Sequence, residues 1–167
     1  MKTLVWLCTV VLLLTLFNTC KEKEDDIGPV QGPVVEWITG GTTTTYSYSG
    51  GVLSAYYFHR SFKVLKESGE VTIHVQVADH SDTRVTGAFQ VEKDKQYKLS
   101  VKASKSGSST SSPGSNCMTV EFGSPNSSTT EKITVNSYLV PAYNEWMTDQ
   151  YYCPKSLSFG EITISEP

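Results

Sequence analysis

The chain has 167 residues, of which 14 are basic and 17 acidic, and its net charge at pH 7 is −3. It has two arginines and no run of basic residues. It therefore lacks the clustered Lys and Arg side chains that phosphate binding needs, and we expect no nucleic-acid partner. The sequence contains no glycine-rich phosphate loop, G-x-S-x-G, H-E-x-x-H or EF-hand loop, so it indicates neither a cofactor nor a catalytic motif.

An apolar segment opens the chain. Lys2 is followed by the run LVWLCTVVLLLTLF, from Leu4 to Phe17. As a helix this run would span about 21 Å, short of the ~30 Å hydrocarbon core of a bilayer. One basic residue, a short apolar run and a polar break are typical of a secretory signal, and we predict a signal peptide over residues 1–19. The alternative is an N-terminal membrane anchor that is never cleaved.

Cys20 directly follows this segment. Ordinary cleavage after Thr19 would place Phe17 at position −3, where a small residue is preferred. The stretch LTLFNTC instead resembles a bacterial lipobox, although Phe17 and Thr19 depart from the usual Leu and small residue. The acidic cluster KEKEDD (21–26) resembles the surface-export signal of Bacteroidetes-type lipoproteins. The resemblance implies that Cys20 carries lipid and anchors the chain in the outer membrane, exposed at the cell surface.

The residues after Cys20 predict a tether. KEKEDD is charged and IGPVQGP is interrupted by Gly and Pro, so residues 20–33 cannot pack and should form a flexible linker. A merely solvated charged linker without an export role is the alternative interpretation of the acidic cluster. Residues 34–167 have the length of one ordinary domain with its own core. Removing residues 1–19 takes away Lys2 and no acidic residue, which leaves 13 basic and 17 acidic residues and a net charge of −4.

Two cysteines remain in the predicted domain. Cys8 leaves with the signal peptide and Cys20 carries the lipid, so Cys117 and Cys153 are left in an oxidising compartment. Two such cysteines most often pair, and we predict a disulfide between them. Two separate buried thiols are the alternative. A metal site is disfavoured because the two residues lack C-x-x-C spacing and have no nearby histidine pair.

Short alternating segments dominate the domain. VTIHVQV (71–77) places Val71, Ile73, Val75 and Val77 on one face, which is the period of a half-buried strand. Gly160 interrupts the last such segment and predicts a bulge. About seven to nine short strands separated by Gly, Ser and Asn turns favour an all-β fold, an antiparallel β-sandwich similar to immunoglobulin-like accessory domains of secreted bacterial proteins, with a small β-barrel as the alternative. The expected strands are 34–38, 43–48, 52–66, 71–77, 84–92, 96–104, 117–122, 131–139 and 156–165.

Polar segments give weaker signals. Residues 104–115 (SKSGSSTSSPGS) are low in complexity and carry no apolar side chain, so we expect a mobile exposed loop. His74 is expected on the solvated face of its strand, and His59 at the surface. His80 lies between Asp79 and Asp82, where a cation site is conceivable, but a turn at the end of a strand is the favoured interpretation.

Aromatic residues cluster just before Cys153. Tyr143, Trp146, Tyr151 and Tyr152 lie close to Asn144, and such a set stacks on sugar rings and bonds their hydroxyls when it is exposed. Ordinary core and edge packing is the favoured alternative, because aromatic residues prefer strands.

We expect a lipid-anchored binding or structural module without catalytic activity, whose partner is a glycan or another surface protein. The alternative is a carbohydrate-binding module or glycan-processing accessory protein that uses the segment 143–152. A catalytic version would need a pair of carboxylates, and Glu145 with Asp149 is the candidate.

Overall fold

The computed structural model describes residues 32–40, 43–50, 52–127, 129–141, 146 and 148–167. The predicted signal peptide, Cys20 and the tether up to Gln31 lie outside these residues. Within the described part of the chain, no helix is long and apolar enough to cross a membrane. This part contains ten strands: β1 (Val34–Trp37), β2 (Thr43–Ser49), β3 (Val52–Lys66), β4 (Gly69–Val77), β5 (His80–Val91), β6 (Gln96–Ser111), β7 (Asn116–Gly123), β8 (Glu131–Asn136), β9 (Tyr138–Val140) and β10 (Gln150–Ser165).

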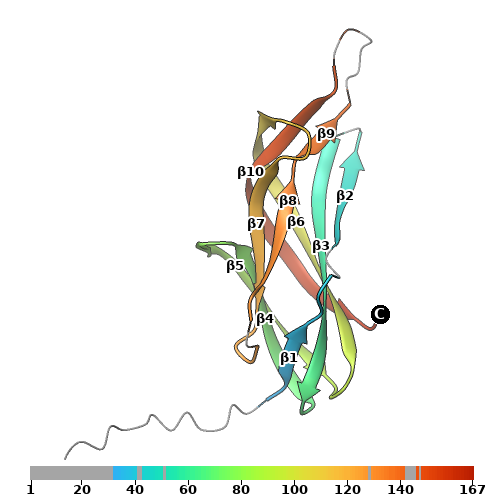
Figure 1. Cartoon of the computed structure of the whole chain (residues 1–167), viewed down its shortest axis with the longest axis vertical. Coiled ribbons are helices and arrows are strands. Elements are labelled where there is room, and N and C mark those ends of the chain that lie inside the picture. Colours follow the sequence, from blue (N-terminus) through green and yellow to red (C-terminus); the bar gives the residue numbers. More distant parts are fainter. Residues whose placement is uncertain (1–31, 41–42, 51, 128, 142–145, 147) are drawn as a thin grey trace, which may run out of the picture. The chain divides into compact units, whose positions relative to one another are not determined.

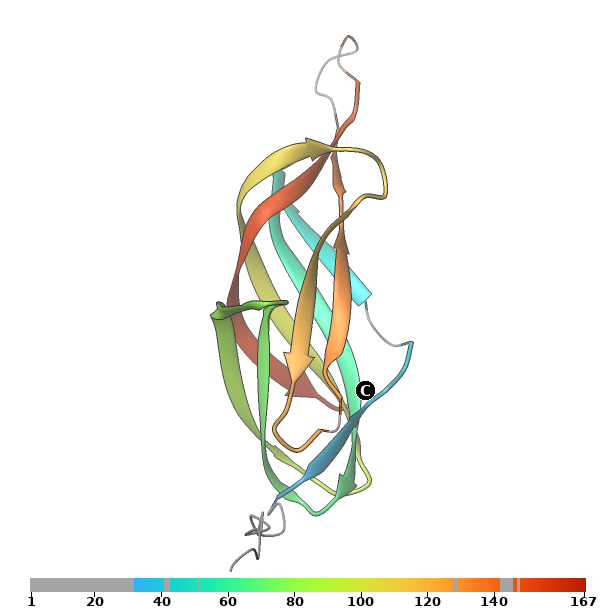
Figure 2. The ribbon, with the colours of Figure 1, turned by 60° about the vertical axis from the view of Figure 1, so that its left-hand side comes forward.

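The strands form two antiparallel sheets that pack face to face (Figure 1, Figure 2). The larger sheet has six strands in the order β1-β3-β6-β10-β9, and β2 pairs with the remaining length of β3. The smaller sheet has four strands in the order β5-β4-β7-β8. The two sheets do not close into a barrel, so the predicted antiparallel sandwich is confirmed and the barrel alternative is wrong.

Alternation along the strands places the core between the sheets. In β4, Val71, Ile73 and Val75 are fully buried, as their period of two predicts. The predicted bulge at Gly160 is also present, because the pairing of β10 with β6 shifts register between Phe159 and Ile162. The local sequence pattern therefore predicted both the buried face of β4 and the bulge in β10.

Several of the predicted boundaries are wrong. β5 begins at His80 rather than at residue 84, and the expected strand 131–139 is divided between β8 of the smaller sheet and β9 of the larger sheet. Two further errors concern β6 and β10. Residues 104–115 are not a loop over most of their length, since β6 continues to Ser111 and pairs with β10 from Ser104 onward. The last strand begins at Gln150 rather than at Ser156. Both errors have one cause: the two segments supply each other's backbone hydrogen bonds, and this long-range pairing overrides the lack of apolar side chains.

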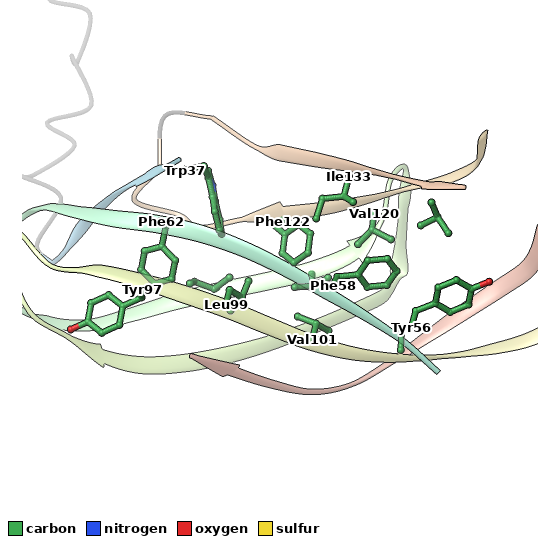
Figure 3. Packing of buried hydrophobic residues seen from close by; sticks show 14 of the residues in the cluster. Trp37, Tyr56, Phe58, Phe62, Tyr97, Leu99, Val101, Val120, Phe122 and Ile133 are labelled. Atoms are coloured by element: carbon green, nitrogen blue, oxygen red, sulfur yellow. The ribbon is translucent and has the colours of Figure 1, made fainter. Parts of the chain in front are cut away.

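Aromatic side chains fill the core from one end to the other (Figure 3). Trp37 of β1 lies with its ring centroid 5.7 Å from Phe62 and 6.1 Å from Phe122, so it bridges both sheets. Tyr56 and Phe58 stack side by side on β3, with centroids 6.1 Å apart. Full burial of such a ring contributes roughly 1.5–3 kcal/mol each, so these residues account for much of the packing energy.

The sandwich has two poles that the strand register defines. Val34 pairs with Lys66, so the described chain begins at the end of β3 that we call the near pole. Val52, at the other end of β3, and the pair Ser111–Tyr151 of β6 and β10 mark the far pole. The 15 residues of β3 span roughly 50 Å between the poles. Figure 1 shows β1 at the lower end, and β9 with the start of β10 at the upper end.

Candidate functional site

The predicted disulfide is present near the far pole. Cys117 of β7 and Cys153 of β10 are bonded, with their α-carbons 5.3 Å apart. Because β7 belongs to the smaller sheet and β10 to the larger one, the bond connects the two layers. It also fixes the beginning of β10, directly after the aromatic segment that was the candidate ligand-binding region.

The structure assigns different environments to the residues of that aromatic segment. Tyr143 and Asn144 lie outside the described residues, as does Glu145. Trp146 is 91% exposed, in the connection between β9 and β10. Tyr152 is half-buried, with its ring 6.2 Å from that of Tyr138. Tyr152 therefore packs, as the alternative interpretation predicted, and Trp146 does not.

Tyr151 borders a shallow groove at the far pole, which we call the tip groove. Its volume is about 360 Å³. The lining is mostly neutral and polar, and among the described residues Asp149 is its one carboxylate. It comes from the end of β6 and the start of β10 and consists of Thr110, Ser111, Pro113, Asp149, Gln150 and Tyr151. The tip groove therefore holds Asp149 and Tyr151 of the predicted segment together, next to the disulfide that fixes Cys153.

A second groove opens on the side of the sandwich, between the edge strands β2 and β8, and we call it the side groove. Its volume is about 370 Å³. Its residues come from both sheets: Thr44, Tyr46, Lys132, Ile133, Thr134 and Asn136. Burial raises the pKa of the Tyr46 hydroxyl, and the neighbouring Tyr48 raises it further. The sequence did not predict this site, because alternation identifies strands without saying which edges face each other.

A buried ion pair crosses between the sheets below the side groove. Arg60 of β3 is 3% exposed, and its Nη2 lies 2.7 Å from Oε1 of Glu131 at the start of β8. Since Arg60 points into the core, the carboxylate offsets a guanidinium charge that burial would otherwise penalise strongly. The ion pair holds the lower end of β8 against β3.

The histidines have structural roles. The two ring nitrogens of His59 form hydrogen bonds with the hydroxyls of Thr45 and Ser100, at 3.2 and 2.8 Å. His59 therefore links β2, β3 and β6. Burial lowers its pKa, and Lys98 lowers it further. His74 was expected to be solvated, but it is half-buried and its ring covers Gly123, where an added Cβ would clash with ring carbon Cε1. Burial, then Arg84, lowers the pKa of His74.

His80 follows a tight turn, as the favoured interpretation predicted. The residue before it, Asp79, has φ of 64°, and the Thr83 hydroxyl donates a hydrogen bond to the carbonyl of His80 at 2.8 Å. Among the residues that the structure describes, no group of three or more His, Cys, Asp or Glu side chains is arranged to hold a metal ion.

Comparison with known proteins adds no family. The chain matches no known family, no curated protein and no solved structure. The two grooves, the exposed Trp146 and the positions of the poles are therefore the features on which a functional proposal can rest.

Proposed function

We propose that the chain is a lipid-anchored, surface-displayed recognition module without catalytic activity. The observation that carries the proposal is the separation of its two poles. Gly32, where the described chain begins, lies at the near pole against Asn126 of the β7–β8 connection. The exposed Trp146 lies in the connection between the far-pole ends of β9 and β10.

This separation suits display. A flexible tether over residues 20–33 would have a root-mean-square length of roughly 20 Å. The sandwich adds roughly 50 Å along β3. A lipid on Cys20 would therefore hold the tip groove and Trp146 well above the membrane, where an exposed indole meets a partner rather than the bilayer.

At the far pole, described strands of both sheets are joined to one another. The Cys117–Cys153 disulfide joins the sheets there, and β6 pairs with β10 up to Ser111 and Tyr151. A surface that is already ordered loses less conformational entropy when a partner binds. Lipid anchoring, cell-surface exposure and a glycan or protein partner at this pole together form one coherent proposal.

Labelling of intact cells tests anchoring and display together. The exposed Ser112 at the far pole is replaced in the variant Ser112→Cys, and cells are treated with a membrane-impermeant maleimide. We expect labelling before lysis, and recovery of the protein in the membrane fraction. In a second variant, Cys20→Ser, the protein should leave the membrane fraction. Labelling only after lysis, or a Cys20→Ser protein that stays membrane-bound, would contradict the proposal.

A glycan-binding function is the second candidate, and the tip groove favours it. Neutral hydroxyl and amide side chains surround Tyr151, and Trp146 is exposed close to it in sequence. Pockets that orient a ligand with a few polar groups beside an aromatic ring suit a sugar. An array of neutral and acidic oligosaccharides tests this candidate. Binding should fall at least tenfold in Trp146→Ala and Tyr151→Ala, and should persist in the control Tyr48→Ala.

The same array separates binding from processing. A recognition module leaves every oligosaccharide intact, whereas a glycan-processing enzyme would release new reducing ends. If turnover occurs and disappears in Asp149→Asn, the non-catalytic proposal is wrong.

A further inference from the structure

β2 is an edge strand with one free side. It pairs with β3 from Thr43 to Ser49, and no other described strand pairs with it. The backbone N–H and C=O groups along the edge of β2 that faces away from β3 are therefore available to a further strand. Figure 1 shows β2 at the right-hand edge of the larger sheet.

The other edges of the sandwich carry the features with which proteins prevent unwanted strand pairing. Charge, proline or a very short length each discourages an incoming strand. These features are Glu36 in the four-residue β1, Asp82 and Arg84 in β5, Glu131 and Lys132 in β8, the three-residue length of β9, and Pro154, Lys155 and Glu161 in β10. β2 has the sequence TTTYSYS over seven residues, without a charge or a proline. Among the described edge strands it alone lacks such protection.

The core-facing side of β2 is only partly covered, and the Tyr46 ring packs at 5.5 Å on Tyr56 of the same sheet. Thr44 and Tyr46 pair with the buried Phe58 and Tyr56, so their side chains lie on the inner face of the sheet. Tyr48 follows on the same face, since the pleat alternates and the register shift lies on the β3 side. Yet Tyr46 is 38% and Tyr48 50% exposed.

The smaller sheet explains this exposure. It has four strands against six and ends at β8. The side groove is the space that remains between β8 and the inner face of β2. Inward-facing tyrosines that the domain leaves open to solvent indicate a surface that a partner covers.

We propose that β2 pairs antiparallel with β2 of a second copy of this chain, centred on Tyr46. Such pairing places Tyr46 opposite Tyr46 and Thr44 opposite Tyr48 on the inner face. On the outer face it places Thr45 opposite Ser47 and Thr43 opposite Ser49. Aromatic pairs and Thr–Ser pairs both stabilise neighbouring strands, so the strand is complementary to itself.

Charge and symmetry favour a second copy over another partner. An uncharged strand pairs with itself without like-charge repulsion, which a strand with lysines or carboxylates would suffer. Antiparallel pairing about one central residue is a two-fold interface, the commonest kind in homo-oligomers. The two inner faces then lie on the same side of a continuous sheet, where the four tyrosines gather between the two copies of β8.

The arrangement goes beyond the proposed display function and does not depend on it. Antiparallel pairing inverts one copy relative to the other, so the near poles lie at opposite ends of the dimer. Two copies on facing surfaces would therefore meet through β2, side by side rather than tip to tip.

Cysteine cross-linking tests the register. The full chain carries Cys8→Ser and Cys20→Ser, which remove the other free thiols and any acyl chain. Two differently tagged forms, Thr45→Cys and Ser47→Cys, are expressed in the same cells. They are then extracted with a nonionic detergent and oxidised. Directly opposite residues lie about 4.5–5.5 Å apart between α-carbons, within the range of a disulfide. We expect the mixed 45–47 product at least tenfold above either self-product. Equal amounts, or self-products alone, would overturn the antiparallel register.

Sedimentation of the same thiol-free chain in detergent tests the association itself. The unaltered β2 should give a dimer at concentrations up to about 100 μM, and both Tyr46→Lys and Thr45→Lys should weaken it at least tenfold. Thr86→Lys on the exposed face of β5 is the matched control and should leave the dimer intact. Circular dichroism confirms that each variant keeps its β content. A monomer at all concentrations, or a dimer that all three substitutions leave unchanged, would overturn the proposal.

Discussion

At the scale of single residues, the Arg60–Glu131 ion pair places a charged side chain in the core. Arg60 is almost fully buried, and Glu131 is 27% exposed. A buried guanidinium that loses its carboxylate is costly, whereas replacing both partners by apolar side chains often costs little. The pair therefore fixes how β8 sits on β3 more than it adds net stability.

The substitution Glu131→Ala should lower the free energy of unfolding by about 1–3 kcal/mol, since the partial exposure of Glu131 reduces the penalty. The double variant Arg60→Met with Glu131→Leu should recover part of this loss. Urea unfolding of the three proteins measures both effects. The control Glu92→Gln weakens an exposed pair with Lys95, 3.2 Å long, and should change stability by less than about 0.5 kcal/mol. A loss from Glu131→Ala no larger than that of the control would contradict the role of the pair.

The two part-buried histidines predict a pH dependence. Burial lowers the pKa of His59 and of His74 below the usual 6.5. The unfolded chain therefore binds protons at a higher pH than the folded chain does. Stability from the neutral histidines is present above pH 6.5 and is lost as the pH falls through their folded pKa values.

Urea midpoints between pH 7 and pH 5 should therefore fall with pH beyond what the carboxylates cause. The variant His74→Gln should flatten this fall, while His80→Gln, at an exposed position, should leave it unchanged. An equal slope in the wild-type protein and in His74→Gln would show that His74 does not contribute.

At the scale of elements, the strands show which parts of the fold are local in origin. The alternation in residues 71–77 predicts β4 because one face carries only Val and Ile. The end of β6 lacks such a signal, since it consists of Ser, Gly, Lys and Thr, and it forms a strand because β10 pairs with it. The side groove was missed for the same reason: it depends on where β8 ends relative to β2, which no local pattern records.

Gly107 has a left-handed backbone conformation within the Ser-rich part of β6 that pairs with β10. Its φ is +67°, and Lys155 packs directly over it. A side chain there meets both left-handed backbone strain and a close neighbour, so Gly107→Val should cost about 1–2 kcal/mol. The exposed neighbour Ser106 provides the control, and Ser106→Ala should be nearly neutral in thermal unfolding. A neutral Gly107→Val would contradict the conformation described for β6.

The disulfide acts at the level of the two sheets. It joins β7 to β10 across a sequence separation of 36 residues. Closing a loop of this length removes unfolded-state entropy worth about 4 kcal/mol. The double variant Cys117→Ala with Cys153→Ala should therefore lose about 2–4 kcal/mol but keep its β content, as thermal unfolding and circular dichroism would measure. If the double variant loses as much stability as the wild-type protein does on reduction, the effect belongs to the disulfide. If the stability of the double variant is unchanged, the stabilising role of the disulfide is contradicted.

At the scale of the whole molecule, the strand register separates the start of the described chain from the proposed recognition surface. The described chain begins at the near pole, the paired strands β3 and β6 run between the poles, and the tip groove with Trp146 lies at the far pole. The sequence predicted the sandwich and the disulfide from local pattern and cysteine arithmetic. It did not predict the poles, because they follow from the strand register.

The central claim depends on Cys20, and intact-mass analysis of the mature protein from its membrane fraction tests it most directly. We predict a polypeptide that starts at Cys20, lacks residues 1–19 and carries the added mass of acyl chains on Cys20. Two such chains bury enough methylenes, at about 0.8 kcal/mol each, for stable anchoring. A polypeptide that starts elsewhere, or one with an unmodified Cys20 thiol, would contradict it.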